Sequence, residues 1–144
     1  DSVSYRLLAS AHPFGDVEDH EWRNRILLMR TTKTRRAVGA ISSPPISPRW
    51  GPDTWHHLAA TWQVAPEGLS RMALYLDGEL VDEKPVAWGS NKPPSAFTIG
   101  SWGGGYADAV IDDVYVLDRA INADEVKRFH ASSEAAVPSK EARR

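Results

Sequence analysis

The chain has 144 residues, a formal net charge of -2 and no cysteine. This length is sufficient for one domain with a sizeable core. The charge gives no bulk attraction to nucleic acid or to an anionic membrane, and the lack of cysteine excludes disulfides and thiolate chemistry. No apolar run approaches the roughly 18 residues of a membrane span. We therefore expect neither a nucleic-acid partner nor a membrane span.

The first part of the chain predicts short strands separated by polar connections. Residues 5–11, 26–30 and 37–41 are apolar runs of strand length, and residues 31–36 predict a hairpin connection between the second and third runs. Residues 42–52 contain four prolines. Because proline cannot donate to a sheet ladder, this segment predicts an extended connection.

The middle of the chain predicts an antiparallel sheet. Residues 55–64 and 71–76 mix β-branched, aromatic and apolar side chains, and residues 79–86 return after Asp77 and Gly78. A two-residue type I′ turn requires positive φ at both central positions, which Asp-Gly tolerates best. We therefore predict a tight hairpin at this point.

The next part predicts two glycine-rich loops around a short strand. Residues 88–95 contain glycine, asparagine and two prolines, and residues 97–100 predict a strand. Residues 101–106 include three successive glycines, which lose too much entropy in a regular element. We expect these six residues to form a loop.

The last part predicts a strand, a helix and a tail. Residues 109–117 form the most strand-like run of the chain. Asn122 followed by Glu125 is a capping-box pattern, which predicts a short helix over residues 122–131. Residues 134–144 are rich in alanine, proline, serine and charge and predict a tail or linker after a domain spanning residues 1–133. Short strands with Gly/Pro-rich turns and one helix indicate an all-β fold, a β-sandwich or jelly roll.

Four motifs occur in an order that resembles a known family. They are Trp-His-His-Leu-Ala at 55–59, Leu-Tyr-Leu-Asp-Gly at 74–78, Ile-Gly at 99–100 and the run beginning Ile-Asp-Asp-Val-Tyr-Val-Leu at 111–121. The chain resembles the laminin-G-like domain of the concanavalin A-like lectin/glucanase superfamily, closely from Trp55 to about Phe129 and loosely before that.

The resemblance implies a concanavalin A-like jelly-roll β-sandwich that recognises glycans or proteins. It implies a secreted, cell-surface or periplasmic location within a larger protein. The first strands of the family, often with an aromatic-Asp-Gly segment, are not found before Tyr5. We expect either that the chain is a fragment or that other domains or chains complete the sheet, because an open sheet edge invites pairing.

Catalysis is not expected. A glycosidase needs two carboxylates about 5 to 10 Å apart across the scissile bond, and the Glu-x-Asp-x-x-Glu pattern of hydrolytic relatives is absent. Asp112 and Asp113 are adjacent, so on a strand they would point to opposite faces, and Asp77 and Glu79 flank a turn. We predict that the protein is not an enzyme.

The paired histidines His56 and His57 are expected on one strand with rings on opposite faces, which disfavours chelation of one metal ion. The prediction for His57 is a sheet histidine hydrogen-bonded to a neighbour. A strand carboxylate such as Asp112 or Asp113 is one candidate partner, because the bond would orient the ring and satisfy a partly buried acid.

A calcium ion is the one cofactor that the sequence suggests. Calcium takes six to eight oxygen ligands from carboxylates and carbonyls. Asp108, Asp112 and Asp113 follow the glycine-rich loop and form one candidate set, and the acidic residues 16–21 form another. The alternative for both sets is solvated acidic side chains without an ion.

Sugar binding is the main functional hypothesis, because aromatic rings on loops can stack against the apolar faces of sugars. The candidate residues are Trp88, Asn91, Trp102 and Tyr106, which lie in the two predicted glycine-rich loops and could meet at one rim of the sandwich. One alternative is that these rings only cover the core. The alternative function is a structural or protein–protein interaction module, or a subunit of a larger assembly, without a glycan site.

Overall fold

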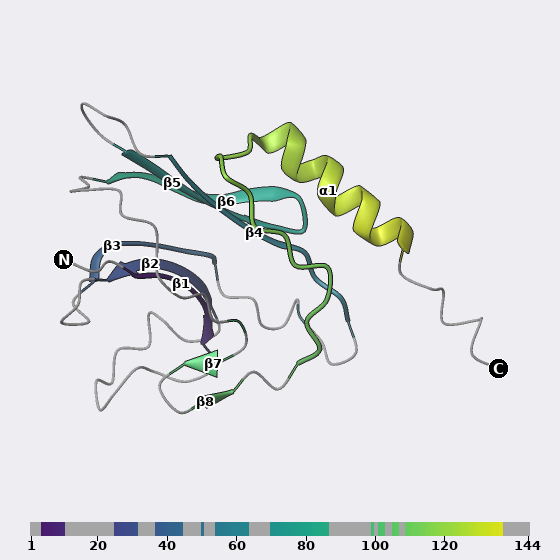
Figure 1. The fold of residues 1–144 in the computed structure, drawn as a ribbon, viewed down its shortest axis with the longest axis horizontal. Helices are drawn as coiled ribbons and strands as arrows, with labels where there is room; N and C mark the ends of the chain where they lie inside the picture. Colours follow the sequence, from purple (N-terminus) through teal and green to yellow (C-terminus); the bar gives the residue numbers. More distant parts are fainter. Residues whose placement is uncertain are drawn as a thin grey trace.

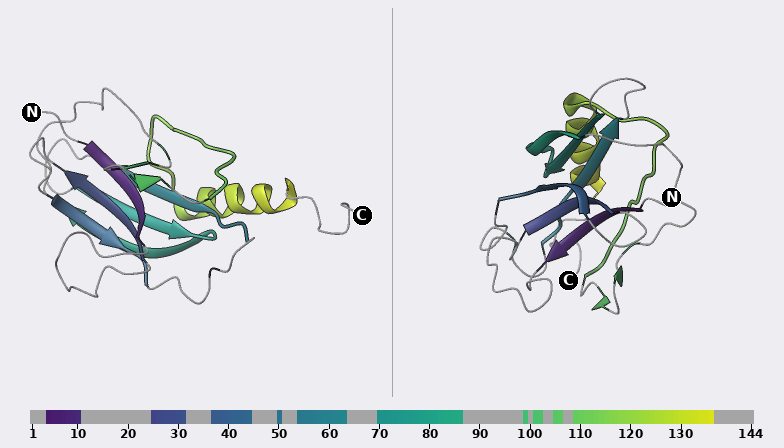
Figure 2. Two further views of the ribbon diagram at one scale, coloured as in Figure 1. Left: turned by 90° about the horizontal axis from the view of Figure 1, so that it is seen from below. Right: turned by 90° about the vertical axis from the view of Figure 1, so that its left-hand side faces the viewer.

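A computed structural model of the chain consists of two three-stranded antiparallel sheets, a two-stranded ribbon and one helix (Figure 1). The structure describes residues 4–10, 25–31, 37–44, 50, 54–63, 70–86, 99, 101–102, 105–106 and 109–136. Within this part, the two sheets lie face to face and the helix covers the outer face of one of them, as two further views show (Figure 2). The described part is therefore a β-sandwich with one helix.

The first sheet contains β1 (Ser4–Ser10), β2 (Arg25–Thr31) and β3 (Ala37–Ser42), with β2 in the centre. Both pairings are antiparallel. All three predicted strands are confirmed, and the antiparallel β2–β3 pairing agrees with a hairpin connection, although residues 32–36 lie outside the described part.

The second sheet contains β4 (Leu58–Gln63), β5 (Ser70–Leu76) and β6 (Glu79–Val86), with β5 in the centre. The predicted strands are confirmed, except that the first of them begins at Leu58 rather than at Trp55. His56 and His57 therefore precede the strand instead of lying on it.

The turn between β5 and β6 has the predicted geometry. Leu76 pairs with Glu79 across the turn, and both central residues have positive φ, 49° at Asp77 and 80° at Gly78. Gly78 is also buried. A Cβ atom there would lie 2.9 Å from Cδ2 of His130, so this position requires glycine both for its backbone and for the close packing of the helix.

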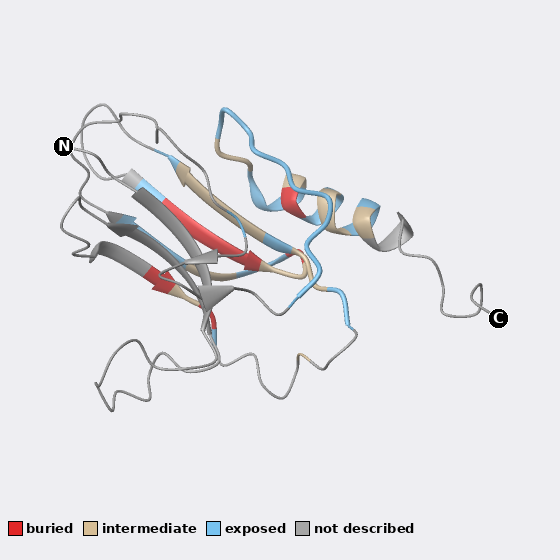
Figure 3. Cartoon of the chain, turned by 60° about the horizontal axis from the view of Figure 1, so that its bottom comes forward, coloured by how far each residue is buried: buried red, intermediate tan, exposed pale blue. Residues whose placement is uncertain are grey.

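Strand β5 is buried on both faces, which Figure 3 shows as the red stretch within the second sheet. Side chains alternate along a strand, and one set, Met72 and Leu74, packs with Ile41 of the other sheet. These three buried side chains form the core between the sheets. Partly buried neighbours complete this core: Trp50, Ala60, Trp62, Leu76 and Val81.

The other face of β5 forms a second core under the helix α1 (Ala123–Ala136). Ala73 and Tyr75 pack with Val126, whose side chain is fully buried, and with the partly buried Ala59 and Ile121. The alternation of β5 thus divides the hydrophobic core into two layers, one between the sheets and one beneath the helix.

Polar contacts at the edge of the sandwich join the two sheets. The backbone N–H of Ser42 on β3 donates to Oδ2 of Asp82 on β6 at 3.0 Å. The ammonium of Lys84 lies 3.7 Å from the same oxygen. The carboxylate of Asp82 therefore satisfies a backbone donor at the point where β3 ends.

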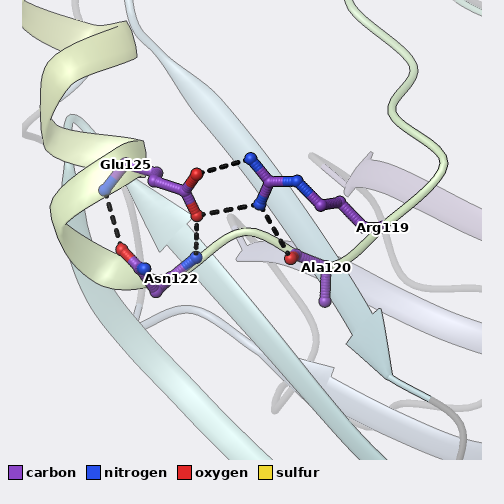
Figure 4. Close-up of polar contacts among 4 residues, drawn as sticks. All are labelled: Arg119, Ala120, Asn122 and Glu125. Carbon is purple, nitrogen blue, oxygen red and sulfur yellow. Dashed lines mark hydrogen bonds and ion pairs between the residues drawn. The ribbon is translucent and has the colours of Figure 1, made fainter.

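The N-terminus of α1 confirms the capping-box prediction (Figure 4). The backbone N–H of Glu125 donates to Oδ1 of Asn122, and the backbone N–H of Asn122 donates to Oε2 of Glu125, both at 3.0 Å. Arg119 donates to both carboxylate oxygens of Glu125, at 2.6 and 3.0 Å. The helix continues to Ala136, beyond the expected end at residue 131 and into the predicted tail, whose residues 137–144 lie outside the described part.

The strand prediction for residues 109–117 is wrong. No strand is assigned there, and the apolar side chains of the segment are exposed: Val110, Ile111, Val114, Tyr115, Val116 and Leu117. β-Branched residues favour a strand only when a neighbouring strand pairs with it, and none of the described strands pairs with this segment. Tyr115 contacts the ring of Phe129, with centroids 5.7 Å apart, which places the segment beside α1.

The loop prediction for residues 101–106 is also wrong in part. Two short strands, β7 (Ser101–Trp102) and β8 (Gly105–Tyr106), pair antiparallel across residues 103–104, which lie outside the described part. Of the strand predicted at residues 97–100, only Ile99 is described, and it is exposed and not in a strand. The described residues include no helix that is both long and apolar enough to cross a membrane.

Candidate functional site

Two of the four predicted sugar-binding residues lie together in the β7–β8 hairpin. Trp102 pairs with Gly105 and Tyr106 pairs with Ser101, so the two aromatic residues occupy successive rungs of one ribbon. The ribbon lies on the opposite side of the molecule from α1 (Figures 1 and 2). The other two predicted residues, Trp88 and Asn91, lie outside the described residues.

The predicted calcium ligands are described only in part. Asp112 and Asp113 are exposed, and Oδ1 of Asp112 accepts a hydrogen bond of 2.8 Å from the backbone N–H of Asp113, whose φ is 50°. They do not face opposite sides of a strand, because the segment is not a strand. Asp108 and residues 16–21 lie outside the described part.

The described residues include only part of the predicted calcium ligands. No three carboxylate, histidine or cysteine side chains come together there in a way that would hold one, and calcium requires more oxygen ligands than Asp112 and Asp113 supply. A calcium ion at this place stays a prediction.

The structure instead brings together residues that were not paired by sequence reasoning. The ring Nδ1 of His56 lies 3.0 Å from Oδ2 of Asp77. The backbone N–H of His57 donates to Oδ1 of Asp77 at 2.9 Å, and the backbone N–H of Asp77 donates to the carbonyl of His57 at 2.8 Å. The prediction that His57 bonds to Asp112 or Asp113 is therefore wrong: the partner is Asp77, and it binds the backbone of His57 and the ring of His56.

The imidazole of His56 is fixed on three sides. It stacks on Trp50 with centroids 4.2 Å apart and planes within 4°, and its Nε2 lies 3.0 Å from Oγ1 of Thr54. A carboxylate only accepts hydrogen bonds, so the neutral ring carries its proton on Nδ1 toward Asp77 and accepts at Nε2 from the Thr54 hydroxyl.

The Thr54 hydroxyl, the His56 imidazole and the Asp77 carboxylate follow one another in the order of the groups of a nucleophile triad. With the flat stack on Trp50, the arrangement serves to hold the segment before β4 against the β5–β6 turn. No local sequence pattern shows this arrangement, because it follows from the β4–β5 register: the pairing of Leu58 with Leu76, extended by one residue, sets His57 opposite Asp77.

A second histidine contact lies on the helix side of the turn. The rings of His57 and His130 have centroids 5.6 Å apart and are tilted by 36°. Nδ1 of His57 is buried, and no hydrogen bond reaches it from the described residues. Burial lowers the pKa of His57, the nearby His130 lowers it further, and the Asp77 carboxylate opposes both effects.

With two packed antiparallel sheets, a short two-stranded ribbon and a helix on one face, the described part of the chain has the architecture of a β-sandwich. A family model described as the concanavalin A-like lectin/glucanases superfamily, in its laminin-G-like branch, matches residues 21–127. The chain belongs to this superfamily.

Comparison with solved structures gives one distant likeness. A crystal structure of an S-layer domain-containing protein from Clostridium thermocellum ATCC 27405 shares 22% sequence identity with a TM-score of 0.41. The match covers 76% of this chain and 53% of the other, so the chain spans about half the length of that solved structure. A search of curated proteins finds no match.

Proposed function

We propose that the chain is a non-catalytic recognition module that binds a glycan at the β7–β8 hairpin. The observation that carries this proposal is the pairing of β7 with β8, which brings Trp102 and Tyr106 into one short ribbon, at register positions that belong to its two opposite faces. Aromatic side chains offer large rigid contact surfaces at low entropic cost, and binding residues concentrate on connections held by a rigid scaffold.

The proposal extends to the surroundings of the domain. Membership of the superfamily supports a complete jelly-roll sandwich and a secreted, cell-surface or periplasmic location in a larger protein. Further domains or chains would supply additional strands of the sheet. The partner would then be an extracellular glycan, recognised by stacking and by hydrogen bonds to its hydroxyl groups.

The test is a glycan-array screen of the chain and of three variants, in calcium and in a chelator. We expect Trp102→Ala and Tyr106→Ala to reduce binding at least tenfold with an unchanged Tm. Trp55→Ala is the matched control, because Trp55 is a tryptophan that is 53% exposed elsewhere on the surface. Binding that survives Trp102→Ala, or a large loss of Tm in that variant, would contradict the proposal. Loss of binding in the chelator alone would indicate a functional calcium ion.

A second candidate function, a protein–protein interaction module, is favoured by the exposed apolar side chains of residues 110–117. Large apolar groups that are contiguous on a surface mark interaction sites. If the array shows no binding, sedimentation velocity of the chain and of Val116→Lys tests this candidate in its simplest form. Self-association of the unchanged chain that is lost in Val116→Lys would support the interaction module. Monomers in both samples would contradict self-association as the role of residues 110–117.

A further inference from the structure

The contact between α1 and the β5–β6 turn is made by a histidine that lies against another histidine. The ring of His130 lies directly over Gly78, where a Cβ atom would be only 2.9 Å from its Cδ2. The His57 ring, from the segment before β4, is the neighbour of His130 at 5.6 Å between centroids. Two imidazoles therefore lie together between the helix and the turn.

The other described contacts of α1 are apolar packing and an ion pair, and they contain no histidine. Val126 is fully buried against β5, and the charged network of Arg119 and Glu125 holds only the N-terminus of the helix. Apolar packing does not respond to pH in the neutral range. Within the described residues, the second half of the helix contacts the sheet through the His57–His130 pair. Histidine is the side chain whose charge changes near neutral pH.

We propose that this histidine pair makes the docking of the second half of α1 dependent on pH, so that the helix end detaches from the turn when the imidazoles become protonated. Two positive rings at this separation would repel each other where solvent access is reduced. Burial lowers the pKa of His57, and the lowered pKa favours the neutral form of its ring.

The charged groups around the pair do not cancel this effect. Asp77 is the nearby acid, but its two carboxylate oxygens are held by the ring of His56 and the backbone of His57. On the sheet face under the helix, Arg71 and Glu83 pair with each other at 3.1 Å.

The helix itself adds positive charge. Lys127 and Arg128 are exposed on α1 and lie within three residues of His130. The helix has three acidic residues: Asp124 and Glu125 lie in its first turn, and Glu134 follows His130 by about one turn. From residue 126 onward the helix therefore carries two cationic residues, Lys127 and Arg128, against one acidic residue, Glu134, before His130 is protonated.

The experiment is amide hydrogen exchange of the whole chain at pH 7.5 and pH 5.5, corrected for the intrinsic exchange rates. We expect protection of residues 126–136 to fall at least tenfold at the lower pH while protection of β5 changes less than threefold. His57→Gln keeps a polar side chain that cannot be protonated, and we expect it to reduce the fall to less than threefold. Lys84→Gln is the matched control, since it removes one positive charge from β6, where Lys84 lies beside Asp82, and it should behave as the unchanged chain.

An equal fall in the His57→Gln variant, or a parallel loss of protection in β5, would overturn the proposal. If the His57→Gln variant does not fold, NMR titration of the unchanged chain tests the proposal instead. The amide signals of residues 126–136 should then shift together with the imidazole signals of the His57–His130 pair. Helix amide signals that stay unchanged while these imidazole signals shift would also overturn the proposal.

Discussion

Asp77 combines a backbone role with a side-chain role. Its φ of 49° starts the tight turn, and its carboxylate accepts from the ring of His56 and from the backbone N–H of His57. The same residue thus shapes the β5–β6 hairpin and ties the beginning of β4 to it. Asparagine is the replacement closest to this combination, because it tolerates positive φ and keeps one acceptor oxygen.

We expect Asp77→Ala to lower the free energy of unfolding by about 1–3 kcal/mol, because it removes two hydrogen bonds and strains the turn. Asp77→Asn should lose less than half of that amount. Urea unfolding at pH 7.5 measures both values. Equal losses in the two variants would show that the charge, rather than the turn geometry and one acceptor, determines the role of Asp77.

At the scale of the element, α1 is specified locally at its beginning. Asn122 and Glu125 satisfy each other's backbone N–H groups, and Arg119 holds the Glu125 carboxylate (Figure 4). These hydrogen bonds lower the pKa of Glu125 to about 2 and raise the pKa of Arg119. Helix caps of this kind contribute to stability without any tertiary contact.

The lowered pKa determines how the cap responds to acid. A carboxylate with a depressed pKa in the folded state gives stability that is present above its unfolded pKa, near 4.5, and is lost as the pH falls toward 2. We expect the Glu125 carboxyl signal in an NMR titration to move with a midpoint near 2 and to shift upward in Arg119→Gln. A midpoint near 4.5 in the unchanged chain would contradict the capping network.

Local signals account for what the sequence predicted correctly, and partners distant in the chain account for what it did not. The Asp77-Gly78 turn and the Asn122 cap each depend on residues no more than four positions apart, so the sequence predicts both.

Residues 109–117 have the composition of a strand, but a strand also needs a neighbouring strand to pair with. None of the described strands pairs with this segment. The bond between His56 and Asp77 spans 21 residues and depends on the β4–β5 register, which no local pattern shows. Trp102 and Tyr106 are candidates from the sequence, but only the structure shows that they lie in one ribbon.

At the scale of the whole molecule, β5 is the strand that both cores share. Leu74 is fully buried between the sheets, and Ala73 and Tyr75 lie under α1. The sandwich and the helix layer are therefore joined through one backbone segment. A substitution that destabilises the packing on one face of β5 should therefore also destabilise the layer on the other face.

We expect Leu74→Ala to lower the free energy of unfolding by about 2–5 kcal/mol, the usual cost of a large cavity in a core. The unfolding transitions followed by far-UV circular dichroism and by tryptophan fluorescence should stay coincident, because the two layers share β5. Val116→Ala is the matched control: its side chain is 69% exposed, and the change should stay within about 0.5 kcal/mol. Two separated transitions in Leu74→Ala would indicate that the helix layer and the sandwich unfold independently.

The double burial of β5 also limits how the hairpin can misfold. A slip of one residue in the pairing would exchange the faces of the strand, moving Ala73 and Tyr75 between the sheets and Met72 and Leu74 under the helix. Such a slip would also place Leu76 or Glu79 at a positive φ and would separate Asp77 from His57. The β5–β6 turn, through its requirement for Asp77 and Gly78, therefore decides on which side of the sheet the helix can dock.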